Sequence, residues 1–313
     1  MRAVTFVEGR VEVQDHPEPE PGTGQILVRV HACGLNGADL IQRRGLYPAP
    51  PGVLPNVPGL EIAGEVAANG PGATRFAPGD RVMAVVGGGG QAEHAVLHER
   101  EAMPVPDGLG WVEAGGLPEV FTTAHDALFT QAGLEAGERL CVHGAAGGVG
   151  TAGVQLGLAT GARVVATVRA PERRDQVATL GATVIDPVGT EDHGPYDVIL
   201  ELVGGPNLDM DIRSLAVGGR VCVIGIGAGA VAEINLGVLM ARRGRVHGST
   251  LRARPLEGKA AAARLMEAHV VPLFQAGRLK VPIDSTFALE DAAKAYDRFA
   301  AGAKFGKVVL TAG

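Results

Sequence analysis

The fold of this chain is decided by the stretch Leu140-Cys-Val-His-Gly144-Ala-Ala-Gly147-Gly148-Val149-Gly150. A short apolar run of the kind found in buried strands is followed by glycines at positions 144, 147 and 150, and then by a segment with helical spacing. Such a turn lets the backbone leave the strand sharply, lets a pyrophosphate approach, and packs the helix on the strand. The helix N-terminus then offers unpaired N–H groups and a positive dipole end to phosphate. The stretch predicts a dinucleotide-binding loop, and the alternative is a strand–helix turn without a ligand.

The sequence on either side of this stretch alternates between short apolar runs and segments of helical spacing. The runs are rich in Val and Ile, as buried parallel strands are. They are Leu140–His143, Arg163–Val168, Thr183–Asp186, Asp197–Val203, Arg220–Gly225 and Arg245–Thr250. Helices are expected at Gly150–Ala159 and Glu172–Leu180. The alternation predicts a doubly wound α/β domain.

The end of the second expected strand indicates which dinucleotide is bound. A site selective for NAD carries Asp or Glu about 20 residues after the glycines, where it accepts a hydrogen bond from the ribose. Here Arg169 stands nineteen residues after Gly150, and Arg173 and Arg174 follow closely. Arginine can hold a 2′-phosphate through two parallel hydrogen bonds. Arg169 and Arg173 therefore predict NADPH, and the alternative is an ordinary solvated helix start.

The rest of the chain has a different organisation. Thirteen of the 20 prolines lie within residues 1–118, among short alternating runs typical of antiparallel strands. Expected strands are Gln25–Cys33, Gly59–Val66, Arg81–Val86 and Gln91–Leu97, with a glycine turn at Gly87–Gly90. After about residue 255 we expect one long helix (Glu257–Ala276), a strand (Ile283–Phe287), a helix opened by Glu290 and Asp291, and a closing strand (Lys307–Thr311).

Composition excludes several classes of protein. Apolar residues make up 46% and charged residues 20% of 313 residues, so the chain has material for a core and is not disordered. The net charge of −6 offers no dominant basic face, which argues against duplex nucleic acid as a partner. The 47 glycines follow no collagen period and fit a protein with many tight turns.

No membrane segment or export signal is expected. The 23 uncharged residues from Leu140 to Ala162 include seven glycines and favour strand, turn and helix over a bilayer span. Charge soon interrupts the N-terminal residues, so no signal peptide is expected. Three cysteines far apart in the sequence (Cys33, Cys141 and Cys222) fit a reducing, cytoplasmic setting.

Several motifs together give a family resemblance that covers essentially the whole chain. They are His31-Ala-Cys-Gly34-Leu-Asn36-Gly-Ala-Asp39, Arg44-Gly-Leu-Tyr47-Pro, Pro58-Gly-Leu-Glu61, Gly79-Asp-Arg-Val82, Phe121-Thr-Thr123-Ala, the glycine stretch, Gly248-Ser-Thr-Leu251 and Gly306-Lys307-Val-Val-Leu310. With them the chain resembles the medium-chain dehydrogenase/reductase superfamily, and more narrowly its zinc-free quinone oxidoreductases related to zeta-crystallin.

The resemblance implies a fold, an assembly and a set of contacts. It implies a GroES-like, mostly-β catalytic domain from residues 1–121 and 256–313, a Rossmann NADP-binding domain from residues 122–255, and a homodimer. It also implies that further residues contact the cofactor beside the glycine loop and the two arginines. These are Thr123, Ile224, Gly225, Leu251 and Lys307.

The resemblance also indicates that no metal is bound. Zinc alcohol dehydrogenases of this superfamily carry Cys and His at the positions that Asn36 and Leu60 occupy here. Tetrahedral zinc needs Cys, His or a carboxylate at such places, so Lewis-acid activation of an alcohol is not expected.

The leading hypothesis is an NADPH:quinone oxidoreductase. A quinone is already electrophilic, so the protein has mainly to position two rings and donate hydrogen bonds to a developing oxyanion. Asn36 and Tyr47 are the candidate donors, against the alternatives of a turn residue and a loop anchor, while Asp39 is expected to cap a helix. Two other functions stay open: reduction of the C=C bond of an enone or enal, and an NADPH-binding sensor or structural protein with little turnover.

Overall fold

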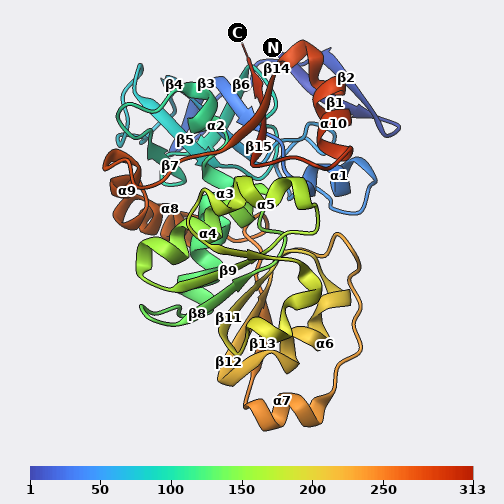
Figure 1. The fold of residues 1–313 in the computed structure, drawn as a ribbon. Coiled ribbons are helices and arrows are strands. Elements are labelled where there is room, and N and C mark those ends of the chain that lie inside the picture. Colours follow the sequence, from blue (N-terminus) through green and yellow to red (C-terminus); the bar gives the residue numbers. More distant parts are fainter. Residues whose placement is uncertain (313) are drawn as a thin grey trace. The chain divides into compact units, whose positions relative to one another are not determined.

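The computed structural model describes residues 1–312, and the chain forms two compact units (Figure 1). The first contains Met1–Thr122, Leu251–Gly302 and the chain from Lys307 onward, and the second contains Thr123–Thr250 and Ala303–Gly306. The expected boundaries lay after residues 121 and 255. The short return of Ala303–Gly306 to the second unit was not expected, and it occurs because Gly306 N donates to Ala146 O at 2.9 Å.

The second unit is built on a six-stranded parallel sheet with the order β10-β9-β8-β11-β12-β13. Its strands are β8 (Arg139–Val142), β9 (Arg163–Thr167), β10 (Thr183–Ile185), β11 (Tyr196–Glu201), β12 (Leu215–Val223) and β13 (Arg245–Gly248). All six expected strands are present, with ends that move by a few residues. This confirms the doubly wound α/β prediction.

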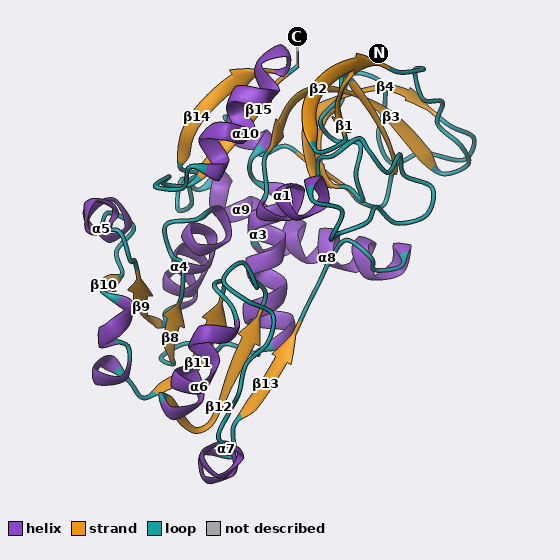
Figure 2. Ribbon diagram, turned by 90° about the vertical axis from the view of Figure 1, so that its right-hand side faces the viewer, coloured by secondary structure: helices purple, strands orange, loops and turns teal. Residues whose placement is uncertain are grey.

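Helices connect these strands and pack on the sheet (Figure 2). They are α4 (Gly148–Thr160), α5 (Pro171–Ala178), α6 (Gly205–Arg213) and α7 (Leu236–Arg242). The first of them, α4, packs on β8 and β9, while α6 packs on β12. Gly153 and Gly157 allow α4 to approach the sheet, because a Cβ at either position would lie 2.7 or 2.6 Å from a leucine methyl group of β11 or β8. Central strand residues such as Leu140 and Ile199 are completely buried.

The first unit is mostly β. A seven-stranded sheet has the order β14-β15-β3-β4-β5-β7, with β6 also pairing with β3, and β1 and β2 form a separate hairpin. The strands are β1 (Arg2–Val7), β2 (Arg10–Asp15), β3 (Gln25–Gly34), β4 (Glu61–Asn69), β5 (Arg81–Val85), β6 (His94–His98), β7 (Ala102–Pro104), β14 (Ile283–Ala288) and β15 (Lys307–Thr311). The last strand, β15, pairs antiparallel with β3, so segments from the N-terminal and C-terminal parts of the chain share one sheet. This is the GroES-like domain that the motifs predicted.

Short helices fill the gaps between these strands. They are α1 (Gly37–Arg43), α2 (Trp111–Gly115), α3 (Pro118–His125, which runs from the first unit into the second), α8 (Leu256–His269), α9 (Val271–Gln275) and α10 (Ala292–Ala300). The expectation of a single helix over Glu257–Ala276 was wrong, because the chain breaks at Val270. Pro272 lacks the N–H that would continue the ladder of hydrogen bonds, and a new helix starts beside it. Within residues 1–312, none of the helices has both the length and the apolar character needed to cross a bilayer.

Candidate active site

The strand order of the second unit reverses at the centre of its sheet. From β8 the chain proceeds outward to β9 and β10, then returns to β11 on the other side of β8 and proceeds to β12 and β13. In open α/β sheets, ligands bind outside the carboxyl ends of the strands where the order reverses in this way. Here that point lies between β8 and β11, directly beside the glycine loop.

The geometry of the glycine loop fits a dinucleotide. Gly144 has a φ of +61°, a left-handed conformation that favours glycine. A Cβ on Gly150 would lie 2.5 Å from Gly144 O, so the helix can approach the turn only without a side chain there. Gly147 is the N-cap of α4 and offers no side chain to cover the first helical N–H groups. The backbone of Gly148, Val149 and Gly150 is thus available to a phosphate group.

Two other expected cofactor residues, Ile224 and Gly225, directly follow β12. Their N–H groups donate to Glu201 O at 2.9 and 3.1 Å. A Cβ on Gly225 would lie 2.2 Å from Leu202 O, so this close approach requires glycine. Both residues therefore stand at the carboxyl edge that carries the glycine loop. Thr123 lies in α3 and is 9% exposed.

The three arginines after β9 differ in their hydrogen bonds and ion pairs. Arg169 follows the carboxyl end of β9 and is exposed. Arg173 donates to Ala303 O and, at 3.1 Å, to Gln176 Oε1, both on the surface. Arg174 is paired with Asp186 and donates to Val168 O at 3.0 Å. Arg169 is the arginine whose guanidinium is most open to a ligand at this edge.

The first unit contains a buried charged cluster around Asn36. Lys307 Nζ lies 2.6 Å from Glu61 Oε1 and donates to Leu35 O at 2.7 Å and Asn36 Oδ1 at 2.8 Å. The side chains of Lys307 and Glu61 are 3% and 0% exposed. An ammonium group has three hydrogens, and these three acceptors occupy them. Lys307, which the resemblance assigned to the cofactor, is therefore a partner of Glu61 with no hydrogen left for a phosphate.

Asn36 is held by this cluster and keeps part of its donor capacity. Its Nδ2 donates to Glu61 Oε1 at 2.9 Å, while the second contact, to Gly34 O, is a weak one at 3.4 Å. One amide hydrogen of Asn36 is thus only loosely engaged. Asn36 is the N-cap of α1, and Asp39, the third residue of the helix, accepts from Asn36 N at 2.8 Å and so completes a capping box. Burial raises the pKa of Asp39 to about 6.

The residues at this place do not fit a zinc ion. Leu60 has no donor atom, and the Asn36 amide already serves Glu61 and Lys307. Burial raises the pKa of the Cys33 thiol, so it stays protonated and is a poor metal ligand. The Lys307 ammonium already supplies the positive charge that balances Glu61, and it would repel a cation.

Tyr47 is placed by an arginine. The Arg252 guanidinium lies over the Tyr47 ring, 4.7 Å from its centroid, and donates to Tyr47 O at 3.0 Å. The same side chain donates to Gly87 O at 2.7 Å and to Gln42 Oε1 at 2.8 Å. Tyr47 is half-buried. The contacts of Arg252 fix its ring and its backbone carbonyl.

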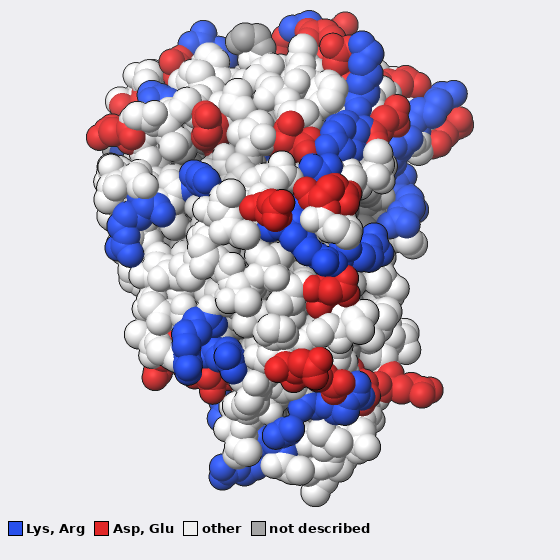
Figure 3. Space-filling view, viewed as in Figure 1, with Lys and Arg blue, Asp and Glu red and all other residues white. Residues whose placement is uncertain are grey.

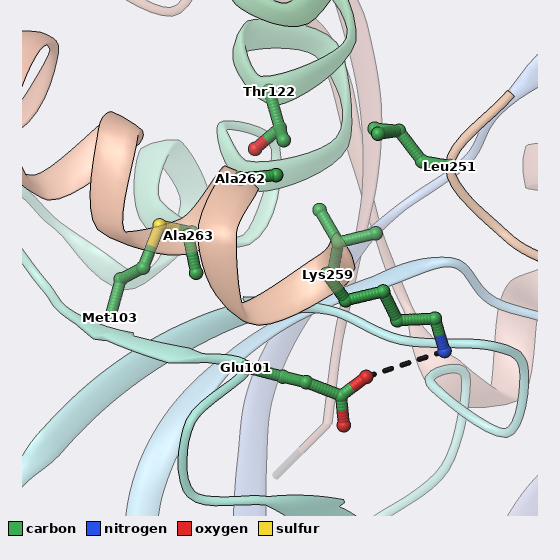
Figure 4. Close-up of a pocket in the computed structure, with 8 residues that line it drawn as sticks. Glu101, Met103, Thr122, Leu251, Lys259, Ala262 and Ala263 are labelled. Carbon is green, nitrogen blue, oxygen red and sulfur yellow. Dashed lines mark ion pairs between the residues drawn. The ribbon is translucent and has the colours of Figure 1, made fainter. Parts of the chain in front are cut away.

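Leu251, which was expected to contact the cofactor, lines a small cavity in the first unit (Figure 4). The cavity measures about 20 Å³, and its wall also includes Thr122 and the pair between Lys259 Nζ and Glu101 Oε1 at 3.3 Å. Ligand pockets measure roughly 300–1,000 Å³, so this cavity is far too small for a ring substrate.

Some residues near these sites were missed by sequence reasoning. Glu61 was quoted only as part of a motif, although it holds both Asn36 and Lys307. Arg252 directly follows a quoted motif, yet nothing in the sequence links it to Tyr47 across 205 residues. His143 directly follows β8 and Glu201 ends β11, and a polar or charged residue after an apolar run was the available signal.

Comparison with known proteins agrees with this architecture. A family model for the alcohol dehydrogenase GroES-like domain matches residues 22–128, and one for zinc-binding dehydrogenases matches residues 160–310. The quinone oxidoreductase of Rattus norvegicus is 35% identical over 328 aligned positions, covering 99% of this chain and 97% of the relative. That of Pseudomonas aeruginosa is 32% identical, covering 96% and 95%.

Solved structures are similar over the full length as well. An alcohol dehydrogenase superfamily protein from Novosphingobium aromaticivorans has a TM-score of 0.89 at 30% identity, with 99% of each chain covered. A mycobacterial protein complexed with NADPH has a TM-score of 0.88 at 28% identity, again with 99% of each chain covered.

Fold, glycine loop and relatives together define a medium-chain dehydrogenase/reductase, an oxidoreductase that binds a nicotinamide cofactor. Within that superfamily the chain belongs to the quinone oxidoreductase-like proteins.

The charged cluster gives a stability prediction. Lys307→Met leaves the Glu61 carboxylate buried without its partner, which should lower the free energy of unfolding by about 3–5 kcal/mol. Urea unfolding measures this loss. The double variant Glu61→Gln/Lys307→Met should recover a large part of it, because no unpaired charge remains. Equal losses in the single and double variants would show that Lys307 stabilises the unit by packing alone.

Proposed function

We propose that this protein is an NADPH-dependent quinone oxidoreductase that works without zinc. The observation that carries the proposal is the Lys307–Glu61 pair, which engages the Asn36 amide and follows Leu60, the two positions where the resemblance indicates that zinc enzymes carry their ligands. Without a Lewis acid, an alcohol or simple ketone is a poor substrate. A quinone needs no such activation, because it is electrophilic and its reduction restores aromaticity.

In this proposal each group has a limited task. The glycine loop and the edge after β12 bind the dinucleotide, which supplies a hydride when it is bound. Asn36 and Tyr47 donate hydrogen bonds to the oxygen on which negative charge develops. Glu61 and Lys307 orient the Asn36 amide from both sides, and Arg252 fixes the Tyr47 ring.

Two alternatives use the same cofactor. An enone or enal reductase would transfer the same hydride to carbon and would need a proton donor as well. A sensor or structural protein would bind NADPH with little turnover. Quinone reduction is favoured because the curated relatives that match over the full length, such as those of Rattus norvegicus and Pseudomonas aeruginosa, are quinone oxidoreductases.

NADPH is preferred over NADH in this proposal. No carboxylate stands directly at the end of β9, and Arg169 is exposed there with Arg173 four residues further on. Negative charge on the 2′-phosphate would pair with these guanidiniums.

The proposed surroundings are a reducing, cytoplasmic compartment and a small-molecule substrate. Cys33, Cys141 and Cys222 are all free and buried. Figure 3 shows Lys and Arg interspersed with Asp and Glu on the face drawn, with no continuous basic stripe for nucleic acid.

A homodimer is also part of the proposal. The strand β13 is at the edge of its sheet, and edge strands carry unpaired backbone groups that favour pairing with another chain. Beside it in sequence, Leu236 and Met240 of α7 are 63% and 77% exposed, and Val246 of β13 is 37% exposed. Pairing of β13 with its copy about a twofold axis would cover these side chains.

Tyr47→Phe tests the catalytic role directly. Removing the phenol deletes one donor and little volume, so quinone turnover should fall by up to about 10²-fold. The NADPH dissociation constant should stay unchanged. The assay follows NADPH absorbance with a panel of quinones and enones. Brisk enone reduction without quinone reduction would give the function to the first alternative, and tight NADPH binding without turnover to the second.

Arg169→Ala and Arg173→Ala test the cofactor preference. A charged hydrogen bond contributes about 1.5–3 kcal/mol, so each variant should raise the NADPH dissociation constant about tenfold or more. NADH binding should barely change. Arg163→Ala is the matched control, because Arg163 opens β9 at its opposite end and should leave both cofactors unaffected. Equal losses for NADPH and NADH would mean that the arginines support the fold instead.

Val246→Glu tests the dimer. A carboxylate on β13 would face its symmetry copy, so the variant should sediment as a monomer in analytical ultracentrifugation while the unchanged protein sediments as a dimer. Val188→Glu serves as the control, because Val188 is 90% exposed at a different place. A monomeric unchanged protein, or a Val246→Glu variant that remains dimeric, would contradict this interface.

A further inference from the structure

A buried charged cluster lies at the root of the glycine loop. His143, the residue before Gly144, has its Nδ1 2.9 Å from Thr167 Oγ1 and its Nε2 2.8 Å from Asp211 Oδ1. Glu201 Oε2 lies 4.0 Å from the same Nε2. The side chains of His143, Glu201 and Asp211 have no exposed surface. Neither the proposed hydride transfer nor the cofactor contacts above use these groups.

The cluster connects β8, β9, β11 and α6, the elements around the point where the strand order reverses. Thr167 ends β9, two residues before Arg169. Glu201 ends β11, and its carboxylate accepts from the N–H groups of Val203 and Gly204 and from Asn207 Nδ2. Asp211 lies in α6, which begins directly after this turn. His143 therefore joins the ends of β8 and β9 to the β11–α6 connection across the point where the strand order reverses.

The cluster places an imidazole between two buried carboxyl groups, and burial raises the pKa of one of them, Glu201. The titratable groups facing His143 are Asp211, Glu201 and Cys141, whose Sγ is 3.8 Å from Nε2. Tyr196 of β11 also interacts with Cys141 and Asp211, and its hydroxyl donates to Thr190 O. Burial lowers the pKa of His143, but Cys141 and Asp211 outweigh it and raise the pKa well above its usual value. Asp211 Oδ2 is buried without a partner, so Asp211 depends on the imidazole for its stabilisation.

We propose that His143 is a positioning residue whose positive charge balances the buried carboxylates of Asp211 and Glu201 behind the phosphate-binding turn. The inference rests on the proposed function in one respect, that the glycine loop binds NADPH. Loss of the proton leaves net negative charge beside the site of a polyanionic cofactor and weakens the link between β8 and α6. Cofactor affinity must then fall.

The direction of the pH effect follows from the raised pKa. A histidine whose pKa is raised by folding contributes its full stabilisation below the pKa of the unfolded chain, about 6.5. It loses this contribution as pH rises through the raised value. Because the protonated imidazole is the form that offsets negative charge beside a polyanionic cofactor, NADPH affinity should decline as pH rises through this raised pKa.

The test is a series of NADPH titrations, followed by NADPH fluorescence, from about pH 7 to about pH 10. This range avoids the 2′-phosphate, because such groups titrate near about pH 6. The dissociation constant of the unchanged protein should rise about tenfold across the range, the factor that about 1.4 kcal/mol produces. His143→Gln should bind NADPH about tenfold more weakly at pH 7 and show a flat profile. His193→Gln is the matched control, because His193 is exposed in the same unit and should follow the unchanged protein.

A second variant keeps the test decisive if His143→Gln does not fold. Asp211→Asn removes a carboxylate that holds the proton on His143, so the decline in affinity should move to lower pH. The inference would be overturned if the NADPH dissociation constant of the unchanged protein did not depend on pH, or if His143→Gln and Asp211→Asn gave the same pH profile. The proposed function would then still stand. Failure of the unchanged protein to bind NADPH or NADH at any pH would overturn both.

Discussion

The first unit depends on the ion pair between Lys307 and Glu61. Lys307 opens the last strand, Glu61 opens β4, and the pair also holds the segment after β3 through Leu35 O and Asn36. Glu61 Oε2 in addition accepts from Glu119 N at 2.8 Å, where α3 begins. Two charges removed from water are costly unless each is fully paired and hydrogen-bonded. Here both are, so four segments far apart in the sequence are fixed at one place.

In the second unit the corresponding constraint is that three positions of the expected cofactor site must be glycine. Gly144, Gly150 and Gly225 each lie where a Cβ would be strained or would meet backbone atoms. Removing side chains opens backbone N–H groups to a phosphate but leaves the turn without packing of its own. The buried cluster behind it supplies this support, since His143 and Glu201 hold the turn and its neighbours through hydrogen bonds.

The sequence predicted the local features of the protein well. The spacing of Gly144, Gly147 and Gly150 and the apolar runs around it are short-range patterns, so strand, turn and helix followed from them. The helix expected over Glu257–Ala276 failed locally, because apolar periodicity continued past Val270 while Pro272 broke the backbone ladder.

What the sequence did not predict depends on contacts between distant residues. Lys307 belongs to one of the quoted motifs, but only the antiparallel pairing of β15 with β3 brings it to Glu61, 246 positions earlier in the sequence. The ion pair with Glu61 and two further hydrogen bonds leave its ammonium group no hydrogen for a cofactor phosphate. Arg173, which is proposed to bind the 2′-phosphate, also donates to Ala303 O, and this contact depends on a four-residue return of the chain to the second unit. Arg252 and Asp211 took on their roles in the same way, through partners that no local pattern reveals.

The central claim is that hydride transfer to a quinone here needs no metal. The most direct measurement is the initial rate of quinone-dependent NADPH oxidation by protein that has been treated with a strong chelator and whose metal content has been determined by elemental analysis. This account predicts an undiminished rate at a negligible zinc content, with no increase when zinc is added back. A rate that vanishes with the metal and returns with stoichiometric zinc would contradict it.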